Sequence, residues 1–348
     1  MTQRYLALDG LRGIAAIFVV IYHMGAIESP SYPFSSAYLA VDLFFVLSGF
    51  VLSHAYDAPL ARGMPVSEFM ARRFARLYPA YIFGLFLGVA AFFITAERIS
   101  IEKFGAALIS GALLVPLPIS LSKEPPIFPL DGPAWSLFLE LLVNAAFAFL
   151  FLRLSRRALT AIILVSSLIL VAFAGTYGNL NLGWDAPNFW GGFPRASFSF
   201  FAGIFLHRLW PEGLKRLGML VMGLGIVALA LPIPAAGHAR YDLLFVLLLG
   251  PATVAAGAGL HLSGLPARVA QICGEISYPL YIIHVPIVIV LKSAMRDWTS
   301  PQTFCGDAIA LPLLLFAAYL LVRFYERPAR QYIQSFRTPG TMQLKQQA

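Results

Sequence analysis

Long apolar runs with few charged residues constrain this chain more than any other feature of its sequence. A membrane-spanning helix needs about 20 apolar residues, and the chain offers ten runs of suitable length. Of its 348 residues, 59% are hydrophobic and 12% are charged, whereas soluble domains carry roughly 25% charged residues. The sequence therefore predicts an all-α polytopic membrane bundle and excludes a soluble enzyme. The ten runs are residues 11–27, 38–54, 78–96, 134–152, 159–176, 196–207, 217–232, 243–260, 273–291 and 308–325.

An eleventh apolar segment, at residues 105–121, contains Pro116 and Pro118. If this segment does not cross the membrane, the loops on the side of the membrane that carries both termini hold 18 of the 25 Lys and Arg residues. The loops on the opposite side then hold seven. The positive-inside rule then places both termini in the cytoplasm. We therefore predict about ten transmembrane helices with this segment re-entrant or interfacial. Residues 1–335 should form one transmembrane domain, followed by a short cytoplasmic tail at 336–348.

Arg12 and His23 are ionisable residues inside the first apolar run. A charged group in the hydrocarbon costs about 2.5 to 3.5 kcal/mol on insertion scales, so such residues mark candidate functional sites. Their separation of eleven residues is three helical turns to within about 20°, which places both side chains on one face. Two interpretations are open. In the first, Arg12 extends its charged end to the membrane surface and His23 is a hydrogen-bonded histidine inside the bundle. In the second, His23 is a catalytic base near the middle of the bilayer, and Arg12, nearer the cytoplasm, binds an anionic cosubstrate.

Two acidic residues in apolar runs could act with His23. Asp42 lies near the outer end of the second run, where its carboxylate could orient the neutral imidazole of His23. A purely structural helix–helix hydrogen bond explains Asp42 equally well. Glu140 is the only acid of the run 134–152, and Trp135 and Ser136 precede it in the motif PAWSLFLE. Trp135 is a candidate substrate contact or a residue of the interfacial aromatic belt.

A polar stripe runs along the motif SYPLYIIH. Ser277, Tyr281 and His284 are spaced at i, i+4 and i+7, so they share one helix face. Pro279 and Pro286 each remove a backbone donor, and the carbonyl groups this frees suit the wall of a cavity. With Ser136, the three stripe residues are predicted substrate contacts, and a structural polar stripe is the alternative.

Arginines cluster just before the third apolar run, in the motif ARRFARLYP. Arg72, Arg73 and Arg76 form an array suited to bidentate contacts with phosphate, or to lipid headgroups and topology. The net charge of +8 comes without a basic tail or a zinc-finger spacing, so nucleic acid is not predicted as a partner. The sequence holds no P-loop, dinucleotide glycine motif or nucleophile elbow, and no pair of His or Cys at metal-ligand spacing, so no metal site is predicted.

Six motifs in order resemble the acyltransferase-3 family of integral-membrane O-acyltransferases. They are LDGLRG followed ten residues later by His23, then VDLFFVLSGF, RRFARLYP, PAWSLFLE, SYPLYIIH and YERP, and together they extend from about residue 8 to residue 330. Each string is weak alone, and the six in order are specific.

The resemblance implies a ten-helix domain in the bacterial inner membrane with cytoplasmic termini. It also implies an acyl-CoA donor, usually acetyl-CoA, as cosubstrate without a permanently bound cofactor, and a glycan or lipid-linked saccharide as acceptor. By position, His23 is the implied catalytic histidine with Arg12 as its motif partner, and Arg73 and Arg76 suit the phosphates of coenzyme A. Some relatives carry a fused periplasmic domain, so a separate periplasmic partner is expected here or none is needed.

The mechanism that follows is direct transfer with His23 as general base, oriented by Asp42 or Glu140. A positioned imidazole contributes about 10² to 10⁴ in rate by taking the proton of the attacking hydroxyl. A covalent acyl-His23 intermediate is the mechanistic alternative. The competing function is a transporter or flippase for a polar or lipid-linked solute, which would use the buried His, Asp and Glu as a proton relay.

Overall fold

The computed structural model describes residues 4–25, 32–95, 100–117, 126–214, 217–232 and 237–335, without the side chains of 334 and 335. In these ranges the regular elements are all helical, and the one strand-like contact is an isolated bridge between Pro126 and Asp185. The predicted all-α class is confirmed. The predicted tail at 336–348 lies outside the described residues.

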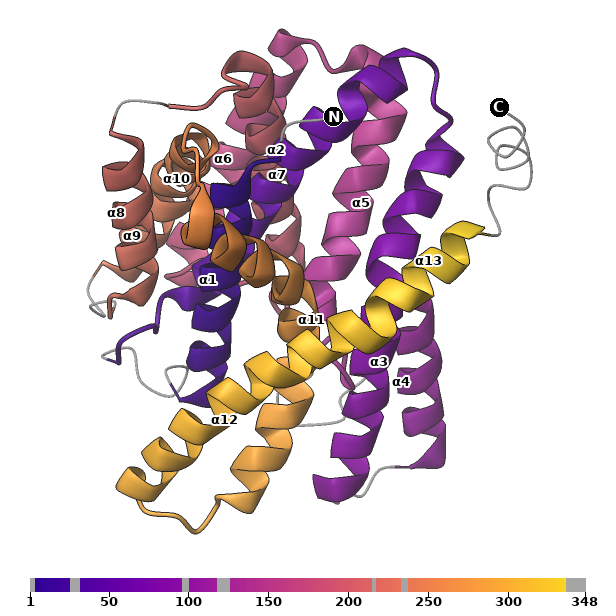
Figure 1. Cartoon of the computed structure of the whole chain (residues 1–348), viewed down its shortest axis with the longest axis vertical. Helices are drawn as coiled ribbons and strands as arrows, with labels where there is room; N and C mark the ends of the chain where they lie inside the picture. Colours follow the sequence, from indigo (N-terminus) through magenta and orange to yellow (C-terminus); the bar gives the residue numbers. More distant parts are fainter. Residues whose placement is uncertain are drawn as a thin grey trace.

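The helices follow the chain from α1 to α13 as Figure 1 labels them. Their bounds are α1 Leu6–Met24, η2 Ala37–Leu39, α2 Ala40–Ala61, α3 Val66–Thr95, α4 Ile101–Leu113, α5 Ala134–Leu150, η3 Phe151–Arg153, α6 Arg156–Tyr177, η4 Phe189–Gly191, α7 Gly192–Leu209, α8 Gly218–Ala230, α9 His238–Leu244, the π-helix η5 Phe245–Leu249, α10 Gly250–Ala258, α11 Gly264–Ala294, α12 Ser300–Leu321, the π-helix η6 Val322–Glu326 and α13 Arg327–Ser335.

Eight helical stretches within the described residues are long and apolar enough to cross a membrane, counting continuous helices as one stretch. They are Leu6–Met24, Ala37–Ala61, Val66–Thr95, Ala134–Arg153, Arg156–Tyr177, His238–Ala258, Gly264–Ala294 and Ser300–Ile333. The other two predicted spans fall on α7 and on α8, which has only 13 residues. The chain is a multi-pass membrane protein, and the count of ten spans is not confirmed.

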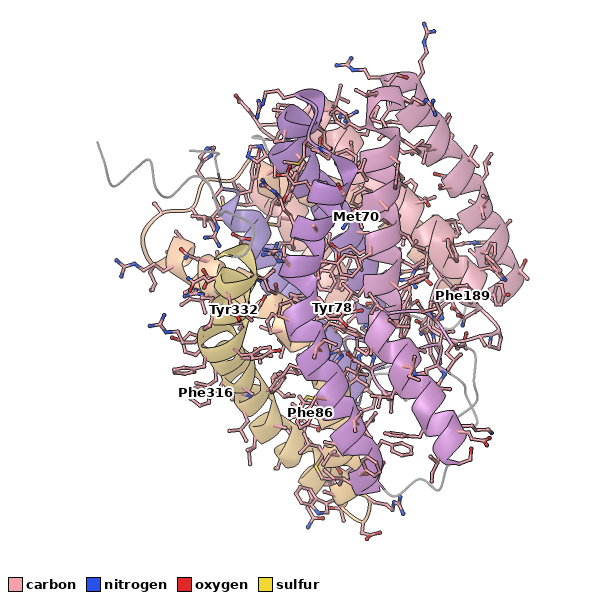
Figure 2. The ribbon with its side chains drawn as sticks, turned by 90° about the vertical axis from the view of Figure 1, so that its right-hand side faces the viewer. Met70, Tyr78, Phe86, Phe189, Phe316 and Tyr332 are labelled. Carbon is pink, nitrogen blue, oxygen red and sulfur yellow. The ribbon has the colours of Figure 1, made fainter. Side chains whose placement is uncertain are left out.

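Large apolar side chains cover the outside of the bundle, as a lipid-facing surface requires. Phe86 on α3 and Phe316 on α12, both labelled in Figure 2, are 65% and 59% exposed. In water such a continuous apolar surface would drive association, whereas in a bilayer it meets lipid tails. A site built from polar side chains of these helices is therefore expected inside the bundle.

Small residues bring the central helices together. A Cβ added to Gly49 of α2 would overlap the carbonyl of Phe200 on α7, and one added to Gly203 of α7 would overlap the carbonyl of Val46. Gly13 of α1 lies in the same way against the backbone of α11. Close approach through small residues is the usual packing mode in membranes, where lipid tails are as apolar as leucine. It holds α1 against α11 and α2 against α7, the two pairs that frame the site.

The described part of the eleventh apolar segment forms α4, which runs antiparallel to α3 and ends halfway along it (Figure 1). Tyr78 and Tyr81 of α3 donate to the carbonyl oxygens of Ala112 and Gly111, both at 2.6 Å. These carbonyls lie at the C-terminus of α4, where helical partners are missing. The helix therefore ends inside the protein, where tyrosine hydroxyls satisfy its last carbonyls, and residues 118–121 of the segment lie outside the described residues.

Candidate active site

The α1–α11 interface carries the first predicted pair. Arg12 donates through Nε to Ser277 Oγ at 3.0 Å and through Nη2 to the carbonyl of Gly274 at 3.0 Å, both on α11. The same Nη2 donates to Asp9 Oδ1 at 2.8 Å. His23 lies further along α1 and also meets α11. The predicted common face of Arg12 and His23 is therefore confirmed, and this face packs on the polar stripe.

His23 and His284 form a pair inside the bundle. Nδ1 of His23 lies 3.3 Å from Nε2 of His284, and the two ring centroids are 4.8 Å apart. Nδ1 of His23 also lies 2.8 Å from the carbonyl oxygen of Val19, and Nδ1 of His284 lies 2.7 Å from that of Tyr281. His284 is completely buried. The residue predicted as a substrate contact is thus a direct partner of the predicted base.

A cavity of about 730 Å³ opens beside this interface, among α1, α2, α3, α5, α11 and the α12–α13 helix. Its lining holds six arginines and four acids, among the described residues. The arginines are Arg4, Arg12, Arg73, Arg76, Arg327 and Arg330, and the acids are Asp9, Glu140, Glu275 and Glu326. Each acid is bound to at least one of these arginines. The surplus of positive charge suits an anionic ligand.

Two of the three predicted α3 arginines line the cavity. Arg73 is buried and its Nη2 donates to Glu140 Oε1 at 2.6 Å, while Ser48 donates to the same oxygen at 3.0 Å. Arg76 lines the cavity within electrostatic reach of Glu326 but forms no ion pair among the described residues. Arg72 lies outside the cavity and binds Glu68, because neighbouring residues point about 100° apart on a helix. Only two of the three arginines that were predicted to bind phosphate therefore face the cavity.

Asp42 has a different partner from the predicted one. Its carboxylate accepts from Arg195 of α7, through Nη2 at 2.6 Å and Nε at 3.2 Å, and the side chains are 2% and 0% exposed. Nη1 of Arg195 donates to the carbonyl of Leu182 at 2.6 Å. Both carboxylate oxygens are therefore engaged by an arginine, and the expected orienting contact with His23 is replaced by a buried ion pair.

Ser136 of the WSL motif lines the cavity together with Ser277 and Tyr281 of the SYPLYIIH motif. Ser136 donates to the carbonyl of Pro133 at 3.1 Å, so Tyr281 is the donor in the 2.8 Å contact between its hydroxyl and Ser136 Oγ. Trp135 is buried under the guanidinium of Arg195, with Cζ 5.3 Å from the ring centre. The ring of Trp135 therefore faces protein and not lipid. Neither His23 nor His284 lines the cavity, but Tyr281 does, and its ring centre lies 5.7 Å from that of His284.

Asp131 is a buried carboxyl that sequence reasoning missed. It lies in the segment before α5 and is 2% exposed, and neither carboxyl oxygen has a hydrogen-bond partner among the described residues. Burial raises the pKa of Asp131 well above its usual range, because desolvation disfavours the charged form. The segment reaches Asp131 past Gly84 and Gly88 of α3, where a Cβ would meet Asp131 and Leu130. Its only sequence signal is the acid inside the string PLDGP.

Two arginines of α13 are among the further residues that sequence reasoning missed, which also include Arg4, Asp9, Glu275, Glu326 and Arg195. Arg327 donates to Glu275 at 2.5 Å, and Arg330 pairs with Glu326. Arg327 is the third residue of the YERP motif, and Arg330 follows that motif by two positions. Their position at the cavity depends on how α12 and α13 cross the bundle (Figure 1), which a one-dimensional pattern does not carry.

Comparisons with known proteins give one family. An acyltransferase domain family, acyltransferase-3, matches residues 5–324. "Protein 2 in picA locus" of Rhizobium radiobacter is 39% identical over 189 residues, which cover 50% of this chain and 97% of that protein. "O-acetyltransferase OatA" of Staphylococcus aureus (strain NCTC 8325 / PS 47) is 26% identical and covers 95% of this chain. "Peptidoglycan O-acetyltransferase OatA" of Listeria monocytogenes is 25% identical and also covers 95%.

The chain matches only part of the length of the two O-acetyltransferases. The chain spans 58% of the length of the Staphylococcus protein and 56% of the Listeria protein. No solved structure matches the chain. The family model nevertheless covers nearly the whole chain, including the histidine pair and all of the cavity lining except Arg4, Glu326, Arg327 and Arg330. The chain belongs to the acyltransferase-3 family of membrane O-acyltransferases.

Proposed function

We propose that the protein transfers an acyl group, usually acetyl, from acyl-CoA to a hydroxyl of a glycan or lipid-linked saccharide, with His23 as general base. The observation that carries this proposal is the arginine-lined cavity, one of whose lining residues, Tyr281, has its ring 5.7 Å from that of His284 in the His23–His284 pair. A phosphate-rich cosubstrate explains the surplus of arginine. A neutral transported solute does not, so the transporter alternative is set aside.

The donor site is the cavity itself. Its volume of about 730 Å³ lies in the usual range of ligand pockets, about 300 to 1,000 Å³. Arg76 forms no ion pair among the described residues and Arg73 is fixed by Glu140, so these two bind the coenzyme A phosphates in our proposal. Arg12 lines the same cavity and donates to Ser277 of the polar stripe. The open end of the cavity then faces the cytoplasm, with both termini on that side of a bacterial inner membrane.

The reaction transfers one proton and one acyl group. Nε2 of His23 takes the proton of the acceptor hydroxyl while the oxygen bonds to the acyl carbon of the thioester. The carbon–sulfur bond then breaks, the sulfur takes the proton from Nε2 of His23, and coenzyme A leaves as the thiol. A sugar hydroxyl is a poor nucleophile at neutral pH, and a positioned base raises the rate by about 10² to 10⁴. Direct transfer needs no covalent acyl-His23.

The two acids have supporting roles in this proposal. Glu140 holds Arg73 in place for the donor and is kept there by Ser48. Asp42 neutralises Arg195, which lies over Trp135 at the wall of the site. Ser136, Ser277 and Tyr281 bound the path between the cavity and the histidine pair. The acceptor arrives from the opposite side of the membrane, alone or delivered by a separate periplasmic partner.

Thioester turnover by the purified protein in detergent tests the proposal. The assay follows coenzyme A release from acetyl-CoA with a thiol reagent, with and without glycans, in wild type, H23Q and H261Q. His261 is an exposed histidine and serves as the matched control. We expect acceptor-dependent release by wild type and H261Q, and a loss of about 10² to 10⁴ in H23Q. Turnover by H23Q at the wild-type rate contradicts the base assignment.

A second readout separates the two chemical mechanisms. With labelled acetyl-CoA and no acceptor, direct transfer leaves the protein unlabelled and gives no burst of coenzyme A. A burst with label retained on wild type and lost in H23Q indicates an acyl-His23 intermediate instead.

A further inference from the structure

The hydrogen-bond partners of the two histidines define which ring nitrogens carry protons. Nδ1 of His284 lies 2.7 Å from the carbonyl oxygen of Tyr281. A carbonyl oxygen only accepts, so Nδ1 of His284 carries the hydrogen. In the neutral ring the other nitrogen, Nε2, is then an acceptor, and this is the atom that faces His23 at 3.3 Å.

The same reasoning applies to His23. Its Nδ1 lies 2.8 Å from the carbonyl oxygen of Val19 and 3.3 Å from the accepting Nε2 of His284. In the opposite tautomer, lone pairs of all three atoms would face one another with no proton between them. The hydrogen of His23 is therefore on Nδ1, shared between two acceptors, and Nε2 is the nitrogen with an available lone pair.

We propose that His284 is a positioning residue for the acyl transfer: its Nε2 holds the Nδ1 proton of His23, so that Nε2 of His23 is the base. The inference rests on the proposed function. It gives His284 the place that a carboxylate holds in a Ser-His-Asp arrangement, which fixes the tautomer and orientation of the catalytic imidazole without itself taking a proton. When Nε2 of His23 takes the hydroxyl proton, Nδ1–H keeps both acceptors and shares the new positive charge with them.

The fold supports this assignment independently of the reaction. His284 is completely buried, and α11 is packed on α1 where Gly13 allows close contact. The polar stripe meets α1 again through Ser277, which accepts from Arg12. The distance between the two rings is thus fixed by two helices that touch along their length, which is what a positioned pair requires.

A glutamine–leucine comparison at position 284 tests the proposal. Gln can place an amide oxygen near the position of Nε2 and accept from His23, but it does not exchange a proton at neutral pH. Leu fills similar space and accepts nothing. We expect kcat to fall no more than about tenfold in H284Q, the range of one neutral hydrogen bond, and about 10² to 10⁴ in H284L, with KM for acetyl-CoA nearly unchanged in both. Equal, large losses of kcat in both variants overturn the proposal, because His284 would then move a proton itself.

Nitrogen-15 NMR of histidine-labelled protein gives a readout that does not depend on activity or on the folding of H284L. The His23 signals are assigned by their loss in H23Q. We expect Nδ1 of His23 to be protonated and Nε2 unprotonated in wild type, and H284Q to keep this tautomer. A protonated Nε2 on neutral His23 overturns the proposal. Failure of the proposed function itself is distinct: wild type would release no coenzyme A, while the tautomer would still be read from the spectrum.

Discussion

Replacing Asp42 by asparagine breaks the buried Asp42–Arg195 pair while keeping its shape. The Arg195 side chain is 0% exposed, and the lost carboxylate is the acceptor for two of its nitrogens. Removing one partner of a buried ion pair costs about 3 to 5 kcal/mol, because the remaining charge stays desolvated. We therefore expect D42N to lower the free energy of unfolding in mixed detergent micelles by about that amount.

The double variant D42L/R195M separates a structural role from a catalytic one. Replacing a whole buried ion pair by apolar residues is often neutral or stabilising, and the hydrogen bond from Arg195 to the Leu182 carbonyl is worth about 1 kcal/mol. The double variant should therefore recover at least about 2 kcal/mol relative to D42N. Titration with a denaturing detergent at constant temperature, monitored by circular dichroism, gives the free energy of unfolding of D42N and of the double variant.

Activity per folded molecule completes the test. If the carboxylate serves Arg195, the turnover of D42N follows its folded fraction. The reasoning is refuted if D42N unfolds at the wild-type detergent concentration while kcat falls by about 10² or more, the loss expected when a base loses its orienting group. That result would restore the role that the sequence alone predicted for Asp42, an orienting contact with His23.

Three further predictions concern the donor cavity, the buried carboxyl and the helix packing. Arg76→Ala should raise KM for acetyl-CoA about tenfold or more, the value of one charge-assisted contact, while Arg72→Ala leaves KM unchanged, as initial rates will show. Because the folded pKa of Asp131 is raised, its protonated form stabilises the fold, and this stability falls as pH rises above the unfolded pKa of about 3.9. Asp131→Asn should therefore be more stable than wild type at pH 7 in thermal unfolding, with a flatter dependence on pH; a steeper one would contradict the assignment. Gly49→Ala should cost about 1 to 3 kcal/mol, since its methyl group meets the Phe200 carbonyl, and wild-type stability would exclude the close α2–α7 contact.

Helical periodicity predicted which site residues of α1 and of α11 share a helix face. The spacing of Arg12 and His23 placed both on one face of α1, and the spacing of Ser277, Tyr281 and His284 placed these on one face of α11. Two faces with buried polar groups in an apolar bundle have few partners other than each other. The pairing of α1 with α11 was thus within reach of the pattern, although it was not predicted.

The second half depends on contacts between distant segments. Asp42 and Arg195 are 153 residues apart, and Arg195 stands at the edge of a predicted span, where it was counted among the loop charges. No local pattern distinguishes a topology charge from a buried ion pair. The count of ten spans is not confirmed for a related reason: α8 has 13 residues, and its apolar composition says nothing about where packing ends the helix.

A structure of the protein with a non-hydrolysable thioether analogue of acetyl-CoA tests the central claim most directly. The account predicts the coenzyme phosphates on Arg73 and Arg76, and the acyl carbon past Tyr281, where an acceptor oxygen about 3.5 Å from it can also reach Nε2 of His23. An analogue bound outside the arginine-lined cavity, or one bound there with its acyl group turned away from the His23–His284 pair, contradicts it.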